Sequence, residues 1–335
     1  MSTTQTTLVN TSVKNGVMTF ELTFDPGNCY THEMMRQLDE AILKARFDET
    51  VQVIVIRGSG EKFFCAGADI NMLKKADPTF KYYFCLHANE TLNRLEHTPK
   101  LVIAALNGHT VGGGLEIAMA ADIRIARKGA GKVGLPEINL GVLPGTGGTQ
   151  RLARLVNKSK AIELMATADV FTFEKALDLG IINDVWEAEN NAAFLDKIQA
   201  YAEGFCAPNR ASKAIGRIKR SVQSGADLPF ESALAVEREL QPHASFALVG
   251  RGRLEREVQR LLLGVPDHGR ADAALDAVSW IAAFDLGQHP RLGPLGDAIE
   301  LNQGSATDAQ AVVGVDGAHR GRIRRTGLFR HPSQG

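Results

Sequence analysis

The chain has 335 residues and a mass of 36.2 kDa, with 38 basic and 38 acidic residues, 44% hydrophobic residues and 6% aromatic residues. This is the composition of a folded globular protein, and it excludes collagen, a coiled coil and wholesale disorder. The net charge of zero gives no basic surplus for a phosphate backbone, so we expect no nucleic-acid partner. No apolar run approaches the ~18–20 residues that cross a bilayer, so no membrane span is expected.

Cysteine usage and the first residues bear on compartment and cofactors. The four cysteines show no spacing typical of a metal site, and the opening residues lack the basic-then-apolar pattern of a signal peptide. These features predict a protein of the reducing cytoplasm that binds no metal. No Gly-x-Gly-x-x-Gly fingerprint precedes a helix, so we expect no nicotinamide cofactor either.

The first half of the chain alternates between strand and helix patterns. Two alternating runs, 8–12 and 17–24, flank Asn15-Gly16, which is a strong signal for a β-hairpin. Apolar spacing over 31–48, with Thr31 as capping residue, predicts a helix. Further helices are expected over 80–96 and 112–121, and further strands over 51–57, 101–106 and 122–126. Such alternation predicts an α/β layered fold with mostly parallel strands.

The second half has helical periodicity and then a change of composition. Helices are expected over 159–166, 172–179, 191–205, 211–223 and 228–240. Every Lys, Cys, Met and Tyr lies before residue 242, whereas residues 242–335 contain 11 Arg and 13 Gly. We therefore divide the chain into a folded domain, residues 1–241, and an atypical, loosely structured or disordered tail, residues 242–335. A shift of reading frame in a GC-rich gene would produce this change, as would a genuine extension or fusion.

Three glycine-containing stretches, 63–70, 107–116 and 135–152, carry the candidate chemistry. The glycine triplet 112–114 follows an apolar strand and precedes a helix, where backbone N–H groups are left bare and favour negative charge. The turn Ala66-Gly67-Ala68 offers a second such N–H. Two donors of this kind form an oxyanion hole, although a plain glycine loop would have the same pattern.

Two acidic residues accompany these glycine turns. Glu116 lies in the first turn of the expected short helix, and Glu137 follows Pro136 in an expected loop. Each has a plain alternative, as a helix N-terminal acid or as a surface acid. Together they indicate paired carboxylates that hold a water and move protons in both directions.

The motifs Ala-Gly-Ala-Asp, Gly-Gly-Gly-x-Glu, Pro-Glu-x-x-Leu-Gly and Pro-Gly-x-Gly-Gly-Thr-Gln-Arg-Leu, in this order, resemble those of the crotonase superfamily, also called the enoyl-CoA hydratase/isomerase family. The resemblance runs from the opening hairpin to about Gln241. It implies an α/β spiral of ββα units with an α-helical C-terminal trimerisation region, approximately residues 190–241. It also implies a homotrimer or hexamer and an acyl-CoA substrate, with coenzyme A as part of the substrate and no further cofactor.

The same resemblance assigns roles to residues. The N–H groups of Ala68 and Gly113 would form the oxyanion hole, Glu116 would deprotonate water, and Glu137 would exchange a proton at the α-carbon. Apart from the resemblance, His109 has no partnered acid visible in the sequence and is expected to be structural. The residues expected to bind substrate and coenzyme A are Cys29, Ala66, Ala68, Asp69, Ile70, Gly112, Gly113, Pro136 and Gly145.

The sequence departs from the family pattern in two places, and it leaves three candidate functions open. Cys29 departs from the Asn-Ala-Leu motif that the family has at this place, and we expect it to be a small packing residue. Nothing after Gln241 matches the helix with which family members usually end. The two acids favour a hydratase that adds water syn to a 2-enoyl-CoA, giving 3-hydroxyacyl-CoA, in fatty-acid β-oxidation or aromatic-acid degradation. The alternatives are an enoyl-CoA isomerase or a cyclic acyl-CoA hydratase or hydrolase of the same family, and an acyl-CoA-binding protein impaired by its altered C-terminus.

Overall fold

The main sheet has six strands in the order β1-β2-β3-β5-β7-β10. The computed structural model describes residues 6–241 of the chain; residues 1–5 and 242–335 lie outside it, as does the expectation for the tail. All neighbouring pairs in this sheet are parallel except β1–β2, which form the expected hairpin. Asn15 and Gly16 both have positive φ, 49° and 81°, as its two-residue turn requires. The strands are β1 (Val9–Lys14), β2 (Val17–Leu22), β3 (Val53–Gly58), β5 (Leu101–Leu106), β7 (Ile123–Arg127) and β10 (Asp184–Trp186).

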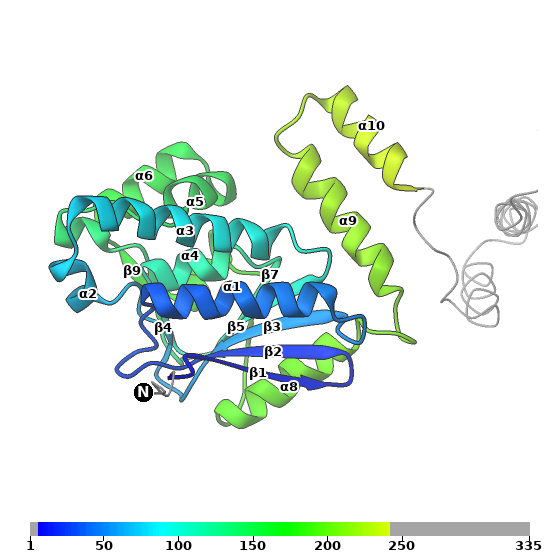
Figure 1. Cartoon of the computed structure of the whole chain (residues 1–335), viewed down its shortest axis with the longest axis horizontal. Helices are drawn as coiled ribbons and strands as arrows, with labels where there is room; N and C mark the ends of the chain where they lie inside the picture. Colours follow the sequence, from blue (N-terminus) through cyan, green and yellow to red (C-terminus); the bar gives the residue numbers. More distant parts are fainter. Residues whose placement is uncertain (1–5, 242–335) are drawn as a thin grey trace, which may run out of the picture. The chain divides into compact units, whose positions relative to one another are not determined.

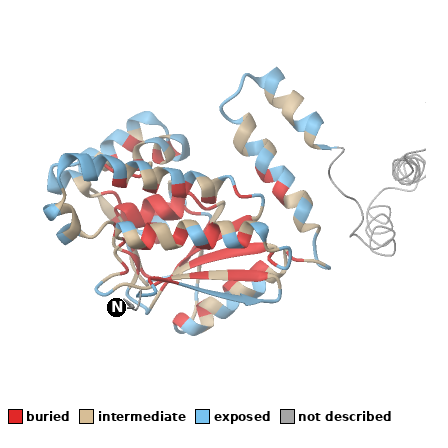
Figure 2. Ribbon diagram, in the orientation of Figure 1, coloured by how far each residue is buried: buried red, intermediate tan, exposed pale blue. Residues whose placement is uncertain are grey.

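Helices cover both faces of this sheet (Figure 1). On one side lies α1 (His32–Phe47), capped by Thr31 as expected, with α3 (Pro78–Glu96) packed against it; on the other lies α8 (Asn191–Glu203). Ile54 and Ile56 of β3 join the core under α1, whereas Val53 and Val55 join the core against α8. This alternation explains why the central strands are buried on both faces in Figure 2.

A second, four-stranded sheet positions the site, and the sequence analysis did not predict it. Its order is β4 (Phe63–Cys65), β6 (His109–Val111), β8 (Lys132–Gly134) and β9 (Val170–Thr172). Each strand has three residues, too few to show an alternating pattern. The turn at 66–68 therefore follows β4, and not the strand over 51–57 as expected from the sequence.

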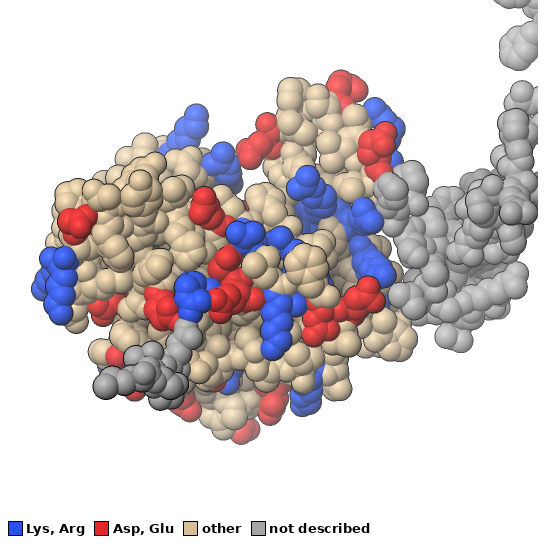
Figure 3. Space-filling view, in the orientation of Figure 1, with Lys and Arg blue, Asp and Glu red and all other residues tan. Residues whose placement is uncertain are grey.

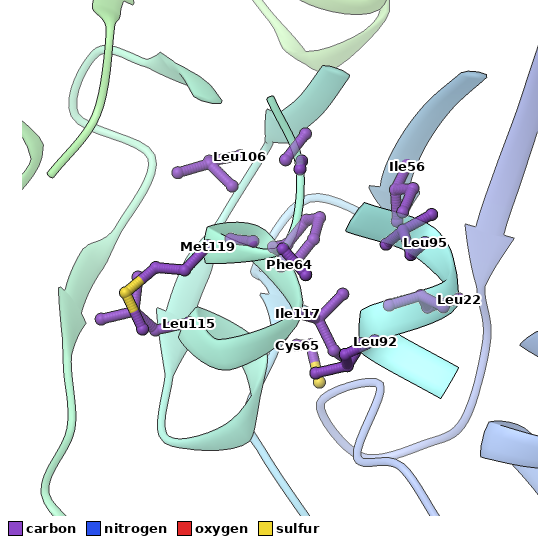
Figure 4. Packing of buried hydrophobic residues seen from close by; sticks show 14 of the residues in the cluster. Leu22, Ile56, Phe64, Cys65, Leu92, Leu95, Leu106, Leu115, Ile117 and Met119 are labelled. Carbon is purple, nitrogen blue, oxygen red and sulfur yellow. The ribbon is translucent and has the colours of Figure 1, made fainter. Parts of the chain in front are cut away.

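The expected short helix, α4 (Gly113–Met119), is buried along its whole length. A Cβ atom on Gly114 would lie 2.0 Å from the carbonyl oxygen of Cys65, so only glycine lets α4 pack directly on β4. Figure 4 shows Leu115, Ile117 and Met119 of α4 in the same cluster as Phe64 and Leu106. The start of α4 is thus held rigidly within the core.

The remaining helices follow the sequence expectation, with three additions. The expected helices appear as α6 (Lys158–Ala166), α7 (Phe173–Asp178), α9 (Ser212–Gly225) and α10 (Phe230–Leu240). A helix α5 (Gly148–Val156) and a 3-10 helix η1 (Glu137–Leu140) were not predicted, and a short helix α2 (Ile70–Lys75) follows the turn at 66–68. α2 and η1 are too short to show helical periodicity, whereas α5 is amphipathic and was overlooked because its start lies in the glycine-rich stretch 145–148.

Helix α9 joins the body through a buried ion pair. Lys219 lies 2.8 Å from Asp122 and donates to the carbonyl oxygen of Lys100. Figure 3 shows acidic and basic side chains interspersed over one face, with basic ones gathered near α9. The lining of a cavity of about 540 Å³ there includes the basic residues Arg46, Lys100, Lys213, Arg217, Lys219 and Arg220, together with Glu49 and neutral residues.

Candidate active site

Most of the predicted site residues line a single cavity of about 450 Å³, near the starts of α2, α4 and η1. The wall is largely apolar, with contributions from α3 and from the segment after η1. The predicted residues on it are Ala66, Ala68, Ile70, Gly112, Gly113, Glu116, Pro136, Glu137 and Gly145. Sequence reasoning therefore identified three separated stretches that the fold brings together.

The backbone of Tyr30 fixes the turn that carries Ala68. The Tyr30 N–H donates to the carbonyl oxygen of Gly67 at 2.9 Å, and the Asp69 N–H donates to the carbonyl oxygen of Tyr30, also at 2.9 Å. In such a parallel bridge the N–H of the central residue, Ala68, points away from Tyr30. It finds no acceptor among residues 6–241, so it is available to a ligand in the cavity.

The second N–H belongs to Gly113, the first residue of α4. Gly112 before it has φ 57° and ψ −134°, a conformation that L residues rarely adopt. A Cβ on Gly67 would lie 3.1 Å from the Gly113 nitrogen, so the two turns are in direct contact. The first N–H groups of a helix have no partner within it. The Ala68 and Gly113 N–H groups are therefore neighbours on one cavity wall, the arrangement that an oxyanion hole requires.

Glu116, 1% exposed, is held by three hydrogen bonds from the segment before and at the start of α5. The N–H groups of Thr146 and Gly148 donate to its Oε1 at 2.8 and 2.7 Å, and the Thr146 hydroxyl donates to its Oε2. Burial raises the pKa of Glu116, while these donors and the nearby Arg151 lower it. The net shift of the Glu116 pKa is upward, and the donors oppose it by stabilising the ionised carboxylate.

Glu137 is the first residue of η1 and lies close to Gly112. A Cβ on Gly112 would lie 3.2 Å from its Oε1, which places this carboxyl group beside the glycine turn that precedes α4. Its Oε2 is buried and has no hydrogen-bond partner in the described part of the chain. Burial, and secondly the charge of Glu116, raise the pKa of Glu137 to about 7. At neutral pH this group is therefore poised to hold or release a proton.

Two predicted binding residues, Cys29 and Asp69, do not line the cavity. The Asp69 carboxylate caps α2 by accepting the Met72 N–H at 2.6 Å. Cys29 is half-buried, and burial raises the pKa of its thiol, consistent with the expected packing role. His109 accepts the Lys132 N–H at 3.1 Å and lies outside the cavity, as expected of a structural residue.

Sequence reasoning missed several residues of the cavity wall. Thr146 was not singled out because one hydroxyl in a glycine-rich segment gives no signal of its own. Apolar periodicity placed α3 in the core without showing that one end faces a ligand cavity. The missed residues include Tyr30, Leu73, Lys81, Phe84, Cys85 and Thr146.

The described residues contain neither a metal-binding cluster nor a membrane-spanning helix. Within 6–241, no group of three or more His, Cys, Asp or Glu side chains is arranged to hold a metal ion. No helix of this part of the chain is long and apolar enough to cross a bilayer.

The fold and the cavity define a class of α/β protein in which two backbone N–H groups and two carboxyl groups share one site. The family model for enoyl-CoA hydratase/isomerase matches residues 12–246. The chain therefore belongs to the enoyl-CoA hydratase/isomerase family, within the crotonase superfamily.

Individual relatives agree with this assignment. The chain is 36% identical over 212 residues to a short-chain-enoyl-CoA hydratase of Clostridium acetobutylicum, covering 63% of this chain and 79% of that protein. It is 34% identical over 209 residues to an (E)-benzylidenesuccinyl-CoA hydratase of Thauera aromatica, covering 62% and 78%. Among solved structures, an enoyl-CoA hydratase of Geobacillus kaustophilus matches with a TM-score of 0.68 and 36% identity, covering 86% of this chain and 97% of that one.

Proposed function

We propose that the protein is an enoyl-CoA hydratase, which adds water syn across the double bond of a 2-enoyl-CoA thioester to give a 3-hydroxyacyl-CoA. The observation that carries the proposal is the pair Glu116 and Glu137 on one cavity wall, one held by three donors and the other with a pKa near 7. Environments that differ in this way assign one carboxyl group as base and the other as acid. Relatives named as hydratases, including a crotonyl-CoA hydratase of Syntrophomonas wolfei at 33% identity, support the same reaction.

The proposed mechanism uses each group once. The thioester oxygen accepts hydrogen bonds from the Ala68 and Gly113 N–H groups, which makes the β-carbon electrophilic. Ionised Glu116 takes a proton from water while the water oxygen bonds to the β-carbon, and negative charge moves to the thioester oxygen. Protonated Glu137 then gives its proton to the α-carbon, and the thioester carbonyl re-forms. Passage of a proton from Glu116 to Glu137 through solvent then restores both groups, so that only water and the thioester are consumed and the proposed reaction requires no other cofactor.

The remaining parts of the proposal concern binding and assembly. Ala66, Ile70, Gly112, Pro136 and Gly145 would contact the acyl-CoA, because all five line the cavity. Residues 1–241 would form the catalytic domain, with 190–241 as the region that assembles trimers or hexamers. Apolar side chains on α9 and α10 support that assembly, since they are well exposed within the single chain: Ile218 (64%), Val222 (64%) and Phe230 (74%).

Isomerisation and hydrolysis remain the competing reactions, and binding without chemistry is a third possibility. A double-bond isomerase moves one proton between carbons and needs only one of the two acids, which leaves Glu116 without a role. The three hydrogen bonds that hold Glu116 in the cavity favour hydration, in which both groups act.

The test is to follow loss of the conjugated enoyl-thioester absorbance when the full chain is mixed with crotonyl-CoA. Product analysis separates hydration from isomerisation, and assay of free coenzyme A thiol detects hydrolysis. We expect wild type to form 3-hydroxybutyryl-CoA, and Glu116→Gln and Glu137→Gln each to lose about 10²–10⁴ in kcat. A wild-type protein that binds crotonyl-CoA and hydrates neither it nor longer or cyclic enoyl-CoA thioesters would overturn the proposal.

A further inference from the structure

The side chain of Tyr30 is a buried part of the cavity wall that the mechanism above does not use. It is 2% exposed, and its ring stacks on Phe84 with centroids 5.8 Å apart. A Cβ on Gly113 would lie 2.3 Å from its hydroxyl oxygen, so the ring lies against the start of α4. Contacts on two sides therefore fix the position of the phenol.

The phenol hydroxyl reaches Glu116 through one intermediate. Tyr30 Oη lies 3.2 Å from Thr146 Oγ1, and Thr146 Oγ1 in turn contacts Glu116 Oε2. An ionised carboxylate has no proton to give, so Thr146 must be the donor to Glu116. The Thr146 hydroxyl has then used its only proton, and Tyr30 must be the donor to Thr146. Both hydrogen bonds therefore run in one direction, from Tyr30 through Thr146 to Glu116.

This direction has a chemical consequence for the base. A hydroxyl that accepts one hydrogen bond becomes a stronger donor in the next, and a buried chain of this kind is cooperative. The chain also orients Thr146, so that Oε2 receives one fixed hydrogen bond and keeps a lone pair for water. Burial and the charge of Glu116 raise the pKa of Tyr30 well above its ordinary value, so the phenol retains its proton at neutral pH.

We propose that Tyr30 is a positioning residue for the general base, acting through Thr146 to orient the Glu116 carboxylate and to keep it ionised. The catalytic part of this inference rests on the proposed hydratase function. The hydrogen-bond chain itself can be tested without any activity, from the titration of Glu116.

Tyr30→Phe is the decisive variant because it keeps the ring and its packing and removes only the hydroxyl. We expect kcat to fall about 3- to 10-fold with little change in KM, as loss of one neutral hydrogen bond implies. The acid limb of the kcat/KM profile should move to higher pH by about half a unit to one unit. Thr146→Val, which removes the direct donor, should move it further, and Thr146→Ser should restore it. Tyr83→Phe is the matched control, since Tyr83 is 61% exposed on α3 and lies outside the cavity.

The double variant separates a hydrogen-bond chain from independent packing effects. If Tyr30 acts through Thr146, Tyr30→Phe should add no shift of the acid limb in the Thr146→Val background. An additive shift, or a fall in kcat with an unmoved acid limb, would overturn the inference. If wild type has no hydratase activity, ¹³C NMR of the Glu116 carboxyl group, assigned with Glu116→Gln, gives the same answer. An unchanged Glu116 titration in folded Tyr30→Phe would also contradict the inference.

Discussion

Glu116 and Glu137 line one cavity, but the protein surrounds them in opposite ways. Glu116 is the more deeply buried, yet it accepts three hydrogen bonds. Glu137 is less buried, yet one of its oxygens has no partner among the described residues, and its pKa rises to about 7. Burial raises the pKa of both carboxyl groups, but only at Glu116 do several hydrogen-bond donors oppose that shift by stabilising the ionised form.

The difference originates in the chain segments that meet each carboxylate. The N-cap of α5 is Gly147, which has no side chain to satisfy the first N–H groups of that helix. Glu116, from another helix, accepts the Gly148 N–H in its place. Glu137 begins a short 3-10 helix and faces Gly112 and the cavity, where no donor approaches its Oε2 within residues 6–241. The Glu116 carboxylate thus caps the N-terminus of α5, whereas the Glu137 carboxylate caps none of the described helices.

The largest expected effect is a difference between Glu116 and Glu137 variants in one half of the reaction, the exchange of the α-proton. If Glu137 exchanges the α-proton and Glu116 acts on water, butyryl-CoA in D₂O should exchange its α-proton without Glu116. We expect Glu137→Gln to lose about 10²–10⁴ in exchange rate and Glu116→Gln to lose less than about tenfold, measured by NMR. The surface variant Glu90→Gln is the control, because Glu90 is exposed on α3. Equal losses in both site variants would contradict the division of roles.

A smaller effect is expected from the glycine turn between the two acids. Gly112→Ala forces a side chain into a conformation that favours glycine and places its Cβ 3.2 Å from Glu137 Oε1. Displacing the Gly113 N–H in this way should cost about 10²–10³ in kcat, as for loss of one oxyanion-hole donor.

The control for this variant is Gly129→Ala. Gly129 also has positive φ, 69°, but a Cβ there would meet nothing within 4 Å. Both variants should lose stability to backbone strain, and only Gly112→Ala should lose activity beyond that. Similar kcat values for the two variants would show that the turn does not position the donor.

The sequence allowed prediction of five of the six strands of the main sheet and of the helices that cover it, because these elements are long enough to show periodicity, whereas the three-residue strand β10 was missed. The expected strand over 101–106 matches β5, and the hairpin turn lies at Asn15-Gly16 as expected. The second sheet was missed because its strands have three residues each. Its strands β4 and β6 are held by parallel pairing to each other, which is a tertiary feature without a local pattern.

The site could be predicted at the level of residue types but not of contacts. The glycine turns and the two acids were identified from their motifs, and the structure places them on one cavity. The three donors to Glu116 were not, because Thr146 and Gly148 lie about 30 residues away along the chain. Asp69 was expected to contact coenzyme A largely through its backbone, which stays a prediction, and the role of its carboxylate as the cap of α2 was not identified from the sequence.

The smallest expected effect concerns stability, and it tests the environment of Glu137 without any substrate. The pKa of Glu137 is raised from 4.5 to about 7 in the folded protein, so the folded state binds this proton more tightly than the unfolded state. Below about pH 4.5 both states are protonated and the burial cost is absent. The loss of folding stability caused by ionising the buried Glu137 carboxyl group grows as pH rises from 4.5 to 7 and reaches its full size above pH 7. After allowance for partial exposure, we expect a cost of about 1–3 kcal/mol at pH 8.

Glu137→Gln removes this ionisation while keeping the shape of the side chain. Urea unfolding from pH 5 to pH 8 should therefore show the variant gaining stability relative to wild type as pH rises, with the smallest difference at pH 5. The control Glu189→Gln, at an exposed position, should show no such trend. A difference that stays constant over the whole range would mean that the buried oxygen of Glu137 finds a donor in solution. The contrast between the two carboxylates would then have to rest on Glu116 alone.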